Sequence, residues 1–177
     1  SSHTAGAVRI GLVAGKLLAE PIKEAQIHLH GSFWATGSGH GTDRAIVAGL
    51  LGLAVDDAKI PHSFELADEA GMKFSFDHVE LVDAHPNTVK LNLTGVNGSV
   101  LEVVAASIGG GRIGTVRILS AEIIGHRGVY ADAKANRNRV HQVLDRVDKG
   151  EGGHGIFADL SNKKTVYDIV KGADQHG

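Results

Sequence analysis

The sequence predicts an α/β fold with an α+β tendency, in which a mixed β-sheet is flanked by helices. Residues 25–30 alternate apolar and polar side chains, and a glycine-rich loop leads from them into an apolar run at helical spacing over residues 44–53. Asn97-Gly98 predicts a tight antiparallel hairpin. A strand-loop-helix unit and an antiparallel hairpin together favour a mixed sheet.

The first half of the chain is predicted to contain three helices. The first opens at Ser1-Ser2-His3-Thr4 and ends at Pro21, and its Gly11 and Gly15, four residues apart, would let another backbone approach closely. The second follows the glycine-rich loop, and Thr42 or Asp43 can cap it. A short third helix ends at Gly71.

Strands dominate the middle of the sequence. The period changes to two at Met72, and the pattern slips near Asp77-His78, where a β-bulge is expected. Strands are then predicted over residues 89–93, 100–106 and 112–119.

The last third of the sequence, residues 120–177, is interpreted as an appendage to a main domain of residues 1–119. It contains a predicted helix, capped by Asp132, whose apolar face includes Val140 and Val147. A charged, glycine-rich linker at residues 149–155, a short strand at 156–157 and a final helix capped by Ser161 are expected after it.

Composition excludes several classes of function. The formal net charge of −2 favours no nucleic-acid partner, and no apolar run approaches the roughly 20 residues of a membrane-spanning helix. No signal peptide is evident, and a cytoplasmic location is expected. The 177 residues include no cysteine, which removes disulfides, thiol nucleophiles and thiolate metal ligands together.

The stretch from Gly31 to Asp43 is the main candidate for a site. Loops between a strand and a helix often bind ligands, because the helix start offers free N–H groups and the positive end of its dipole. His40 lies just before the predicted helix and could bind or move a proton near neutral pH. The hydroxyls of Ser1, Ser2 and Thr4 allow two readings, ordinary capping or an anion site.

Two further loops carry polar residues or glycines. His85 and Asn87 flank Pro86, where a plain turn explains the sequence about as well as a site does. The segment Ser107 to Gly111 lacks the Lys-Ser/Thr of a phosphate loop and the following helix of a dinucleotide site. His28 and His30 have a spacing that could hold a metal, but no third ligand is evident, so a solvated strand face is preferred and no metal site is predicted.

Four of these segments occur in an order and spacing that resemble one family. They are residues 1–6, Gly31-Ser32-Phe33 with Gly39-His40-Gly41-Thr42-Asp43, His85-Pro86-Asn87-Thr88, and residues 107–111. Together they resemble the beta subunit, or beta domain, of the bacterial iron–sulfur-dependent L-serine dehydratases. The resemblance ends near Leu119, and no match follows to the ACT-type tail domain that many two-subunit members carry.

The resemblance implies a lyase of amino-acid catabolism and gluconeogenesis that converts L-serine to pyruvate and ammonia. In such enzymes a [4Fe–4S] cluster acts as a Lewis acid, and cluster iron is held mainly by cysteine thiolates. A chain without cysteine would need a cysteine-bearing alpha subunit, so the resemblance implies a heterodimer and a chain that is inactive alone. The expected catalytic residues are His40 and Thr42. The expected substrate-binding residues are Ser1, Ser2, His3, Thr4, Gly39, His85, Asn87 and Ser107.

An alternative function belongs to a different class. The fold type is similar to the allosteric substrate-binding domain of some phosphoglycerate dehydrogenases, which binds a small anion and does no chemistry. The same loops would then make a regulatory module for a small anion or serine.

Overall fold

The computed structural model describes residues 2–37 and 41–150, with the backbone alone for Ser2 and His3. Helices predominate in the first half of the chain, and the second half contains three strands in succession followed by a helix. The helices are α1 (Ser2–Leu18), α2 (Ser32–Thr36), α3 (Thr42–Leu50), α4 (Ser63–Ala70) and α5 (Ala133–Asp148), with short 3₁₀ turns at Ile60–His62 and Arg127–Tyr130. The strands are β1 (Ile22–Leu29), β2 (Lys73–His78), β3 (Thr88–Gly95), β4 (Val100–Gly109) and β5 (Arg112–Glu122).

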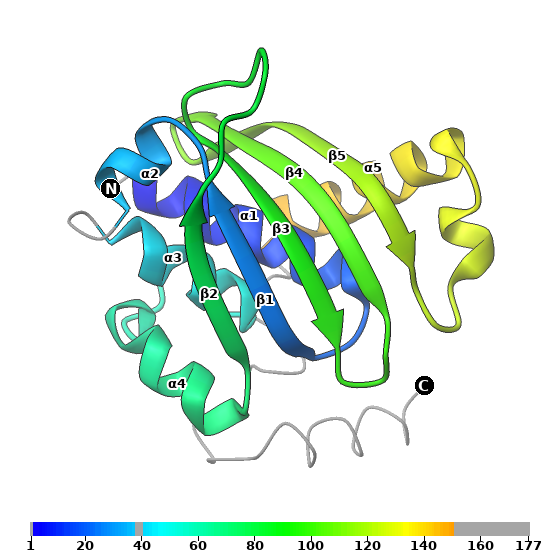
Figure 1. Ribbon diagram of the computed structural model, residues 1–177, viewed down its shortest axis with the longest axis horizontal. Helices are drawn as coiled ribbons and strands as arrows, with labels where there is room; N and C mark the ends of the chain where they lie inside the picture. The colour runs from blue at the N-terminus through cyan, green and yellow to red at the C-terminus, as the bar shows by residue number, and fades with distance from the viewer. Residues whose placement is uncertain (1, 38–40, 151–177) are drawn as a thin grey trace.

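The five strands form one mixed sheet in the order β2-β1-β3-β4-β5 (Figure 1). β1 and β2 are parallel, while the pairs β1–β3, β3–β4 and β4–β5 are antiparallel. The α/β class and the mixed sheet are therefore confirmed, as is the hairpin at Asn97-Gly98. The similarity to the phosphoglycerate dehydrogenase domain stays a prediction.

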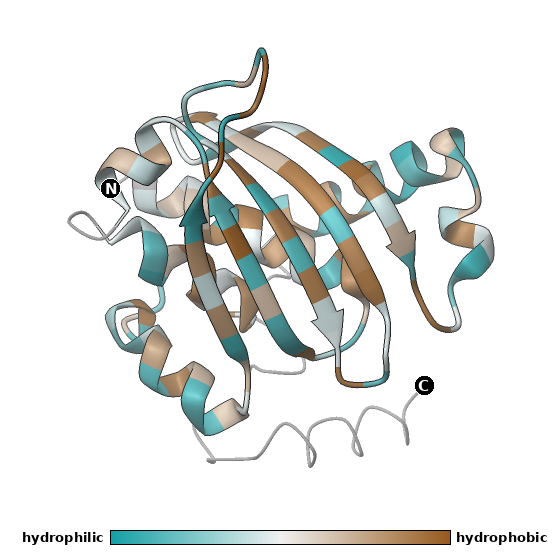
Figure 2. Ribbon diagram, viewed as in Figure 1, coloured by the Kyte–Doolittle hydropathy of each residue, from teal (hydrophilic) through white to brown (hydrophobic). Residues whose placement is uncertain are grey.

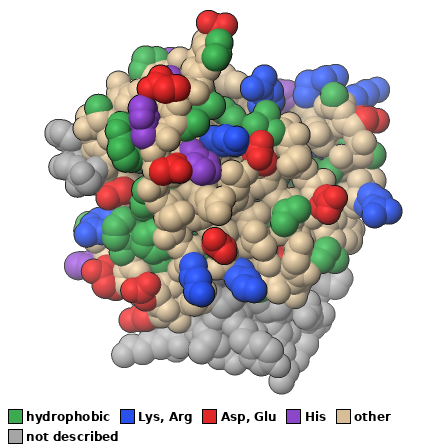
Figure 3. All heavy atoms as spheres, in the orientation of Figure 1, with side chains coloured by type: hydrophobic (Ala, Val, Ile, Leu, Met, Phe, Trp, Pro, Cys, Tyr) green, Lys and Arg blue, Asp and Glu red, His purple; other side chains and the backbone are tan. Residues whose placement is uncertain are grey.

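The core lies between one face of the sheet and the helices. Ala25, Ile27 and Leu29 of β1 are buried on that face, and the apolar side of α1 packs on it, with α3 and α5 beside α1 (Figures 1 and 2). The opposite face is open in the part of the chain that the structure describes. Acidic, basic and histidine side chains are interspersed on it (Figure 3), as antiparallel sheets with one solvated face allow.

Helices α1 and α3 approach each other through glycines. A Cβ atom added to Gly11 would lie 2.5 Å from the carbonyl oxygen of Ile46 and 2.7 Å from the amide nitrogen of Leu50. Gly15 is less constrained, because its added Cβ would lie 3.5 Å from the Leu50 carbonyl oxygen. The close approach predicted for this helix is therefore confirmed at Gly11 and is looser at Gly15.

The structure corrects three details of the sequence analysis. β2 pairs with β1 without a register shift and ends at His78, so the bulge predicted at Asp77-His78 is wrong. The glycine-rich loop contains a short helix, α2, that its glycines concealed. Neither Thr42 nor Asp43 caps α3: the cap is Gly41, in a left-handed conformation with φ 78°.

The end of the described chain matches its predicted elements. The carboxylate of Asp132 accepts a hydrogen bond from the Ala135 amide (2.9 Å), which confirms the predicted cap of α5. α5 packs against α1. Most of the predicted linker at 149–155 lies outside the described residues, as do the whole predicted strand at 156–157 and the final helix. The division at residue 119 therefore stays a prediction. None of the described helices is long and apolar enough to cross a membrane.

Candidate functional site

Segments from all four sequence motifs meet at one end of the sheet. The Ser107 side chain packs against Gly6 in the first turns of α1 so closely that a Cβ on Gly6 would overlap the hydroxyl. The Ser107 amide donates to the carbonyl oxygen of Asn87 at 2.9 Å, and the Ser32 amide donates to that of Pro86 at 2.8 Å. Segments far apart in sequence are thereby joined where β1 ends and β3 begins (Figure 1).

The glycines after Ser107 bring the β4–β5 turn against α1. Gly110 and Gly111 have φ values of 61° and 75°, the pair of left-handed residues that a type I′ hairpin turn requires. Arg9 of α1 donates to the Gly111 carbonyl oxygen at 2.5 Å. The glycines thus serve contact between the turn and the helix. Sequence reasoning missed Arg9, although it is the one Lys or Arg among the first fifteen residues.

The loop from Gly31 to Asp43 is fixed at both ends. Gly31 has φ 58°, and an added Cβ would lie 2.5 Å from the Pro86 carbonyl oxygen, so the residue must be small. At the other end the Asp43 amide donates to the Gly37 carbonyl oxygen at 3.1 Å. The first residue of α3, Thr42, is thereby placed near the end of β1.

Two polar atoms at this end of the sheet are buried and have no hydrogen-bond partner among the described residues. They are the Thr42 hydroxyl oxygen, on a side chain with 0% exposure, and the Asn87 amide oxygen. A buried polar atom without a partner costs about 1–3 kcal/mol, so such atoms are uncommon and call for a reason. Binding of a polar ligand here would supply one.

His85 has a defined neutral tautomer. The Asn87 amide donates to His85 Nδ1 at 3.0 Å, so the ring proton of the neutral imidazole is on Nε2. The Thr88 hydroxyl donates to the His85 carbonyl oxygen at 2.6 Å and holds the turn. The exposed His85 ring therefore offers an N–H donor.

Several of the other predicted site residues lie wholly or partly outside the part of the chain that the structure describes. Ser1, Gly39 and His40 lie outside the described residues, and for Ser2 and His3 only the backbone is described. Thr4 lies in the first turn of α1 and is partly exposed. The structure thus brings Asn87 and Ser107 together through a hydrogen bond, with His85 beside Asn87.

The paired histidines of β1 have partners of their own. His28 Nδ1 bonds to the Asp77 carboxylate, and the Asn92 amide donates to His28 Nε2 at 3.0 Å. His30 Nδ1 accepts from the Leu81 amide at 3.1 Å. No group of three or more His, Cys, Asp or Glu in the described part of the chain could hold a metal ion.

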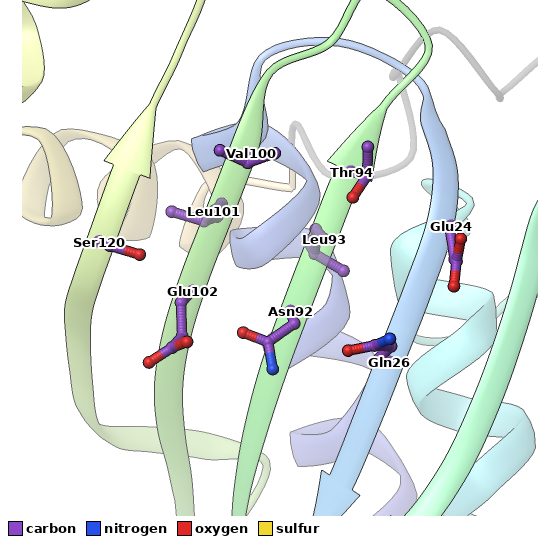
Figure 4. A pocket seen from close by; sticks show the side chains of 9 residues that line it. All are labelled: Glu24, Gln26, Asn92, Leu93, Thr94, Val100, Leu101, Glu102 and Ser120. Atoms are coloured by element: carbon purple, nitrogen blue, oxygen red, sulfur yellow. The ribbon is translucent and has the colours of Figure 1, made fainter.

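A hollow on the open face of the sheet lies away from this site. Glu24, Gln26, Asn92, Thr94, Glu102 and Ser120 line it with polar side chains (Figure 4). None of the predicted site residues is among them. The hollow is therefore not part of the candidate site.

Comparison with known proteins agrees with the motifs. Residues 1–71 match the family model described as serine dehydratase beta chain. The chain is 45% identical over 132 residues to the L-serine dehydratase beta chain of Peptoniphilus asaccharolyticus, covering 74% of this chain and 59% of that protein. It is 42% identical over 113 residues to the probable L-serine dehydratase beta chain of Bacillus subtilis, covering 64% and 51%.

The chain belongs to the serine dehydratase beta-chain family. An L-serine dehydratase of Helicobacter pylori is 34% identical over an alignment of 143 residues, which covers 67% of this chain and 31% of that protein. The chain thus spans between half and three fifths of the first two relatives. Within the serine dehydratase beta-chain match of residues 1–71 lie the start of α1 and the whole Gly31–Asp43 loop, while His85, Asn87 and Ser107 lie beyond it.

Proposed function

We propose that this chain supplies one side of a composite site at which L-serine is converted to pyruvate and ammonia. One observation carries the proposal: segments from α1, the Gly31–Asp43 loop, the 85–88 turn and β4 meet at one end of the sheet, where two buried polar oxygens have no partner within the described part of the chain. The names of the relatives support serine as the substrate.

The donor and acceptor character of the described side chains suits a zwitterionic amino acid. The Asn87 amide oxygen would accept a hydrogen bond from the substrate ammonium group. The His85 Nε2–H would donate a hydrogen bond to the carboxylate. The hydroxyls of Ser1, Ser2 and Thr4 and the side chain of His3 would hold the same carboxylate. Ser107 would position this shell through its bond to Asn87 and its contact with α1.

The proton chemistry is assigned to the Gly31–Asp43 loop. His40 would act as the base that removes the Cα proton, because an imidazole works as both acceptor and donor near neutral pH. The Thr42 hydroxyl would hydrogen-bond the substrate or orient His40, and Gly39 would let the backbone come close. These roles are part of the proposal.

An iron–sulfur cluster does not fit the residues of this chain. The sequence has no cysteine, and no described cluster of His, Asp or Glu could replace thiolate ligands. We therefore assign a [4Fe–4S] cluster to a cysteine-bearing alpha chain and derive no step through it here.

Pyruvate formation from L-serine under strict anaerobiosis tests the proposal. The chain would be assayed alone and then with the cysteine-bearing alpha chain reconstituted with iron and sulfide. Turnover only in the mixture is the expected result. A mixture with an intact cluster and no turnover would contradict it, and serine binding by the isolated chain would then favour a regulatory module.

Replacing His40 with Asn tests the base directly. Loss of a general base is expected to lower kcat by roughly 10²–10⁴ with a modest change in KM. The assay compares the variant and the unmodified chain at saturating alpha chain. A kcat equal to that of the unmodified chain would remove His40 from the mechanism.

A further inference from the structure

Large apolar side chains are exposed around the candidate site. Trp34 of α2 is 46% exposed, Ile108 near the end of β4 is 46% exposed, and Val82 is 92% exposed. They come from three segments that each adjoin a site motif. We refer to these three residues as the apolar rim.

Val82 belongs to a loop that projects from the end of the sheet. The β2–β3 loop, residues 79–87, extends beyond the strand ends, and one side of its outer part is hydrophobic in colour (Figures 1 and 2). Its base is held by three hydrogen bonds: Val79 N to Leu29 O (3.0 Å), Leu81 N to His30 Nδ1 (3.1 Å) and Ser32 N to Pro86 O (2.8 Å). These bonds at the base reduce the conformational freedom that the loop would lose on binding a partner.

Trp34 is also held in place. Its ring stacks on His78 with centroids 5.3 Å apart, and His78 Nε2 lies 2.9 Å from a Glu80 carboxylate oxygen. Exposed aromatic residues that are already ordered are typical anchors of protein interfaces. The Trp34 side of the rim is therefore also pre-organised.

The projecting loop and the end of β2 that leads into it are acidic. Between Lys73 and Lys90 the sequence contains Asp77, Glu80 and Asp83 and no Lys or Arg. A partner surface that covers this loop would need an apolar socket edged by Lys or Arg, since like charges brought together at an interface oppose association.

We propose that the apolar rim and the acidic loop 79–87 form the surface on which the cysteine-bearing alpha chain docks. This inference rests on the proposed composite site. A chain that closes the site at this end of the sheet would cover Trp34, Val82 and Ile108 together. The alpha chain is predicted to present a basic, apolar socket to Val82.

Val82→Asp tests the docking surface by its affinity for the alpha chain. Val82 is almost fully exposed, so the variant should fold and keep its melting temperature. Its Kd, measured by calorimetry under anaerobic conditions, is expected to rise about tenfold or more. Ile124→Asp is the matched control, because Ile124 is 59% exposed and lies beside Gly98, at the opposite end of the sheet; its Kd should not change.

Reversing the charge of the acidic loop provides a second test of the docking surface. Glu80→Lys combined with Asp83→Lys should slow association and abolish or reverse the slowing of association by salt, because charges at the edge of an interface act mainly on the association rate. An unchanged Kd in Val82→Asp together with unchanged association in the double variant would overturn the docking inference. Self-association of the unmodified chain that Val82→Asp abolishes would also overturn it, because the occupant would be a second copy.

The outcome separates docking from function. If Val82→Asp recovers full turnover at high alpha-chain concentration, the residue acts in docking alone, as proposed. If the unmodified chains bind but produce no pyruvate, the proposed function fails, while the comparison of Kd values still tests the docking surface.

Discussion

Among the described residues, Thr42 is the most important for the proposed site. Its hydroxyl is fully buried at the start of α3 and has no partner among the residues that the structure describes, although residues that cap helices ordinarily use such hydroxyls. The sequence offered Thr42 or Asp43 as the cap of α3, a role that Gly41 fills instead, and the family resemblance made Thr42 an expected catalytic residue. Sequence patterns could not show this, because the left-handed turn at Gly41 depends on how the loop is fixed to Gly37.

Thr42→Val is expected to leave the free energy of unfolding unchanged or raise it by about 1 kcal/mol, because the substitution removes a buried hydroxyl that lacks a partner. Urea unfolding of the chain alone measures this. Thr115→Val, on an exposed position of β5, is the control for the change of residue type. A clear loss of stability in Thr42→Val beyond that of the control would show that the hydroxyl has a structural partner.

At the scale of elements, helix α1 organises the molecule. It packs on α3, α5 and β4, and its first turns reach Ser107 and Gly111. Periodicity predicted this helix and its close approach through Gly11, because apolar spacing and small residues are local signals. Periodicity could not predict that α3 is the helix that packs on Gly11, because this packing depends on contacts between residues more than thirty positions apart.

Gly11→Ala should destabilise the protein by about 1–3 kcal/mol, because the new methyl group would press on the backbone of α3. Gly15→Ala in the same helix meets only ordinary contact at 3.5 Å and should be neutral or stabilising by up to about 1 kcal/mol through helix propensity. Urea unfolding compares the two. Equal effects of both substitutions would argue against the α1–α3 packing.

Tyr130 links the end of α1 to the segment before α5. Its hydroxyl donates to the Leu17 carbonyl oxygen, and burial raises the pKa of Tyr130 above its ordinary value near 10, an effect that Arg139 partly opposes. A raised folded-state pKa means that the neutral phenol stabilises the fold below about pH 10 and that this contribution is lost as the pH rises through the folded pKa.

Tyr130→Phe should therefore lower the free energy of unfolding by about 1 kcal/mol at neutral pH, through loss of the hydrogen bond to Leu17. It should also reduce the loss of stability as the pH rises above about 10, because the phenol of the unmodified protein ionises at a raised pKa. Urea unfolding at pH 7 and across this alkaline range measures both effects. Parallel pH curves for the two proteins would contradict the burial argument.

At the scale of the whole molecule, the sequence predicted the fold class but not how the segments of the candidate site are arranged. Alternation and the Asn97-Gly98 turn were sufficient for a mixed sheet. The slip near Asp77 suggested a bulge, but β2 simply ends at His78. The meeting of Ser107, Asn87 and Gly6 could not be derived from the chain itself, because it requires the pairing of β3 with β4 and the docking of α1 on both.

The most direct test of a composite serine site is the kcat of Thr42→Val for pyruvate formation, in the anaerobic mixture with saturating alpha chain. The account predicts a fall of roughly 10–100-fold, as expected when a hydrogen bond to a charged reacting group is lost, with stability retained and Thr115→Val unaffected. A kcat equal to that of the unmodified chain would contradict the placement of the site at this end of the sheet.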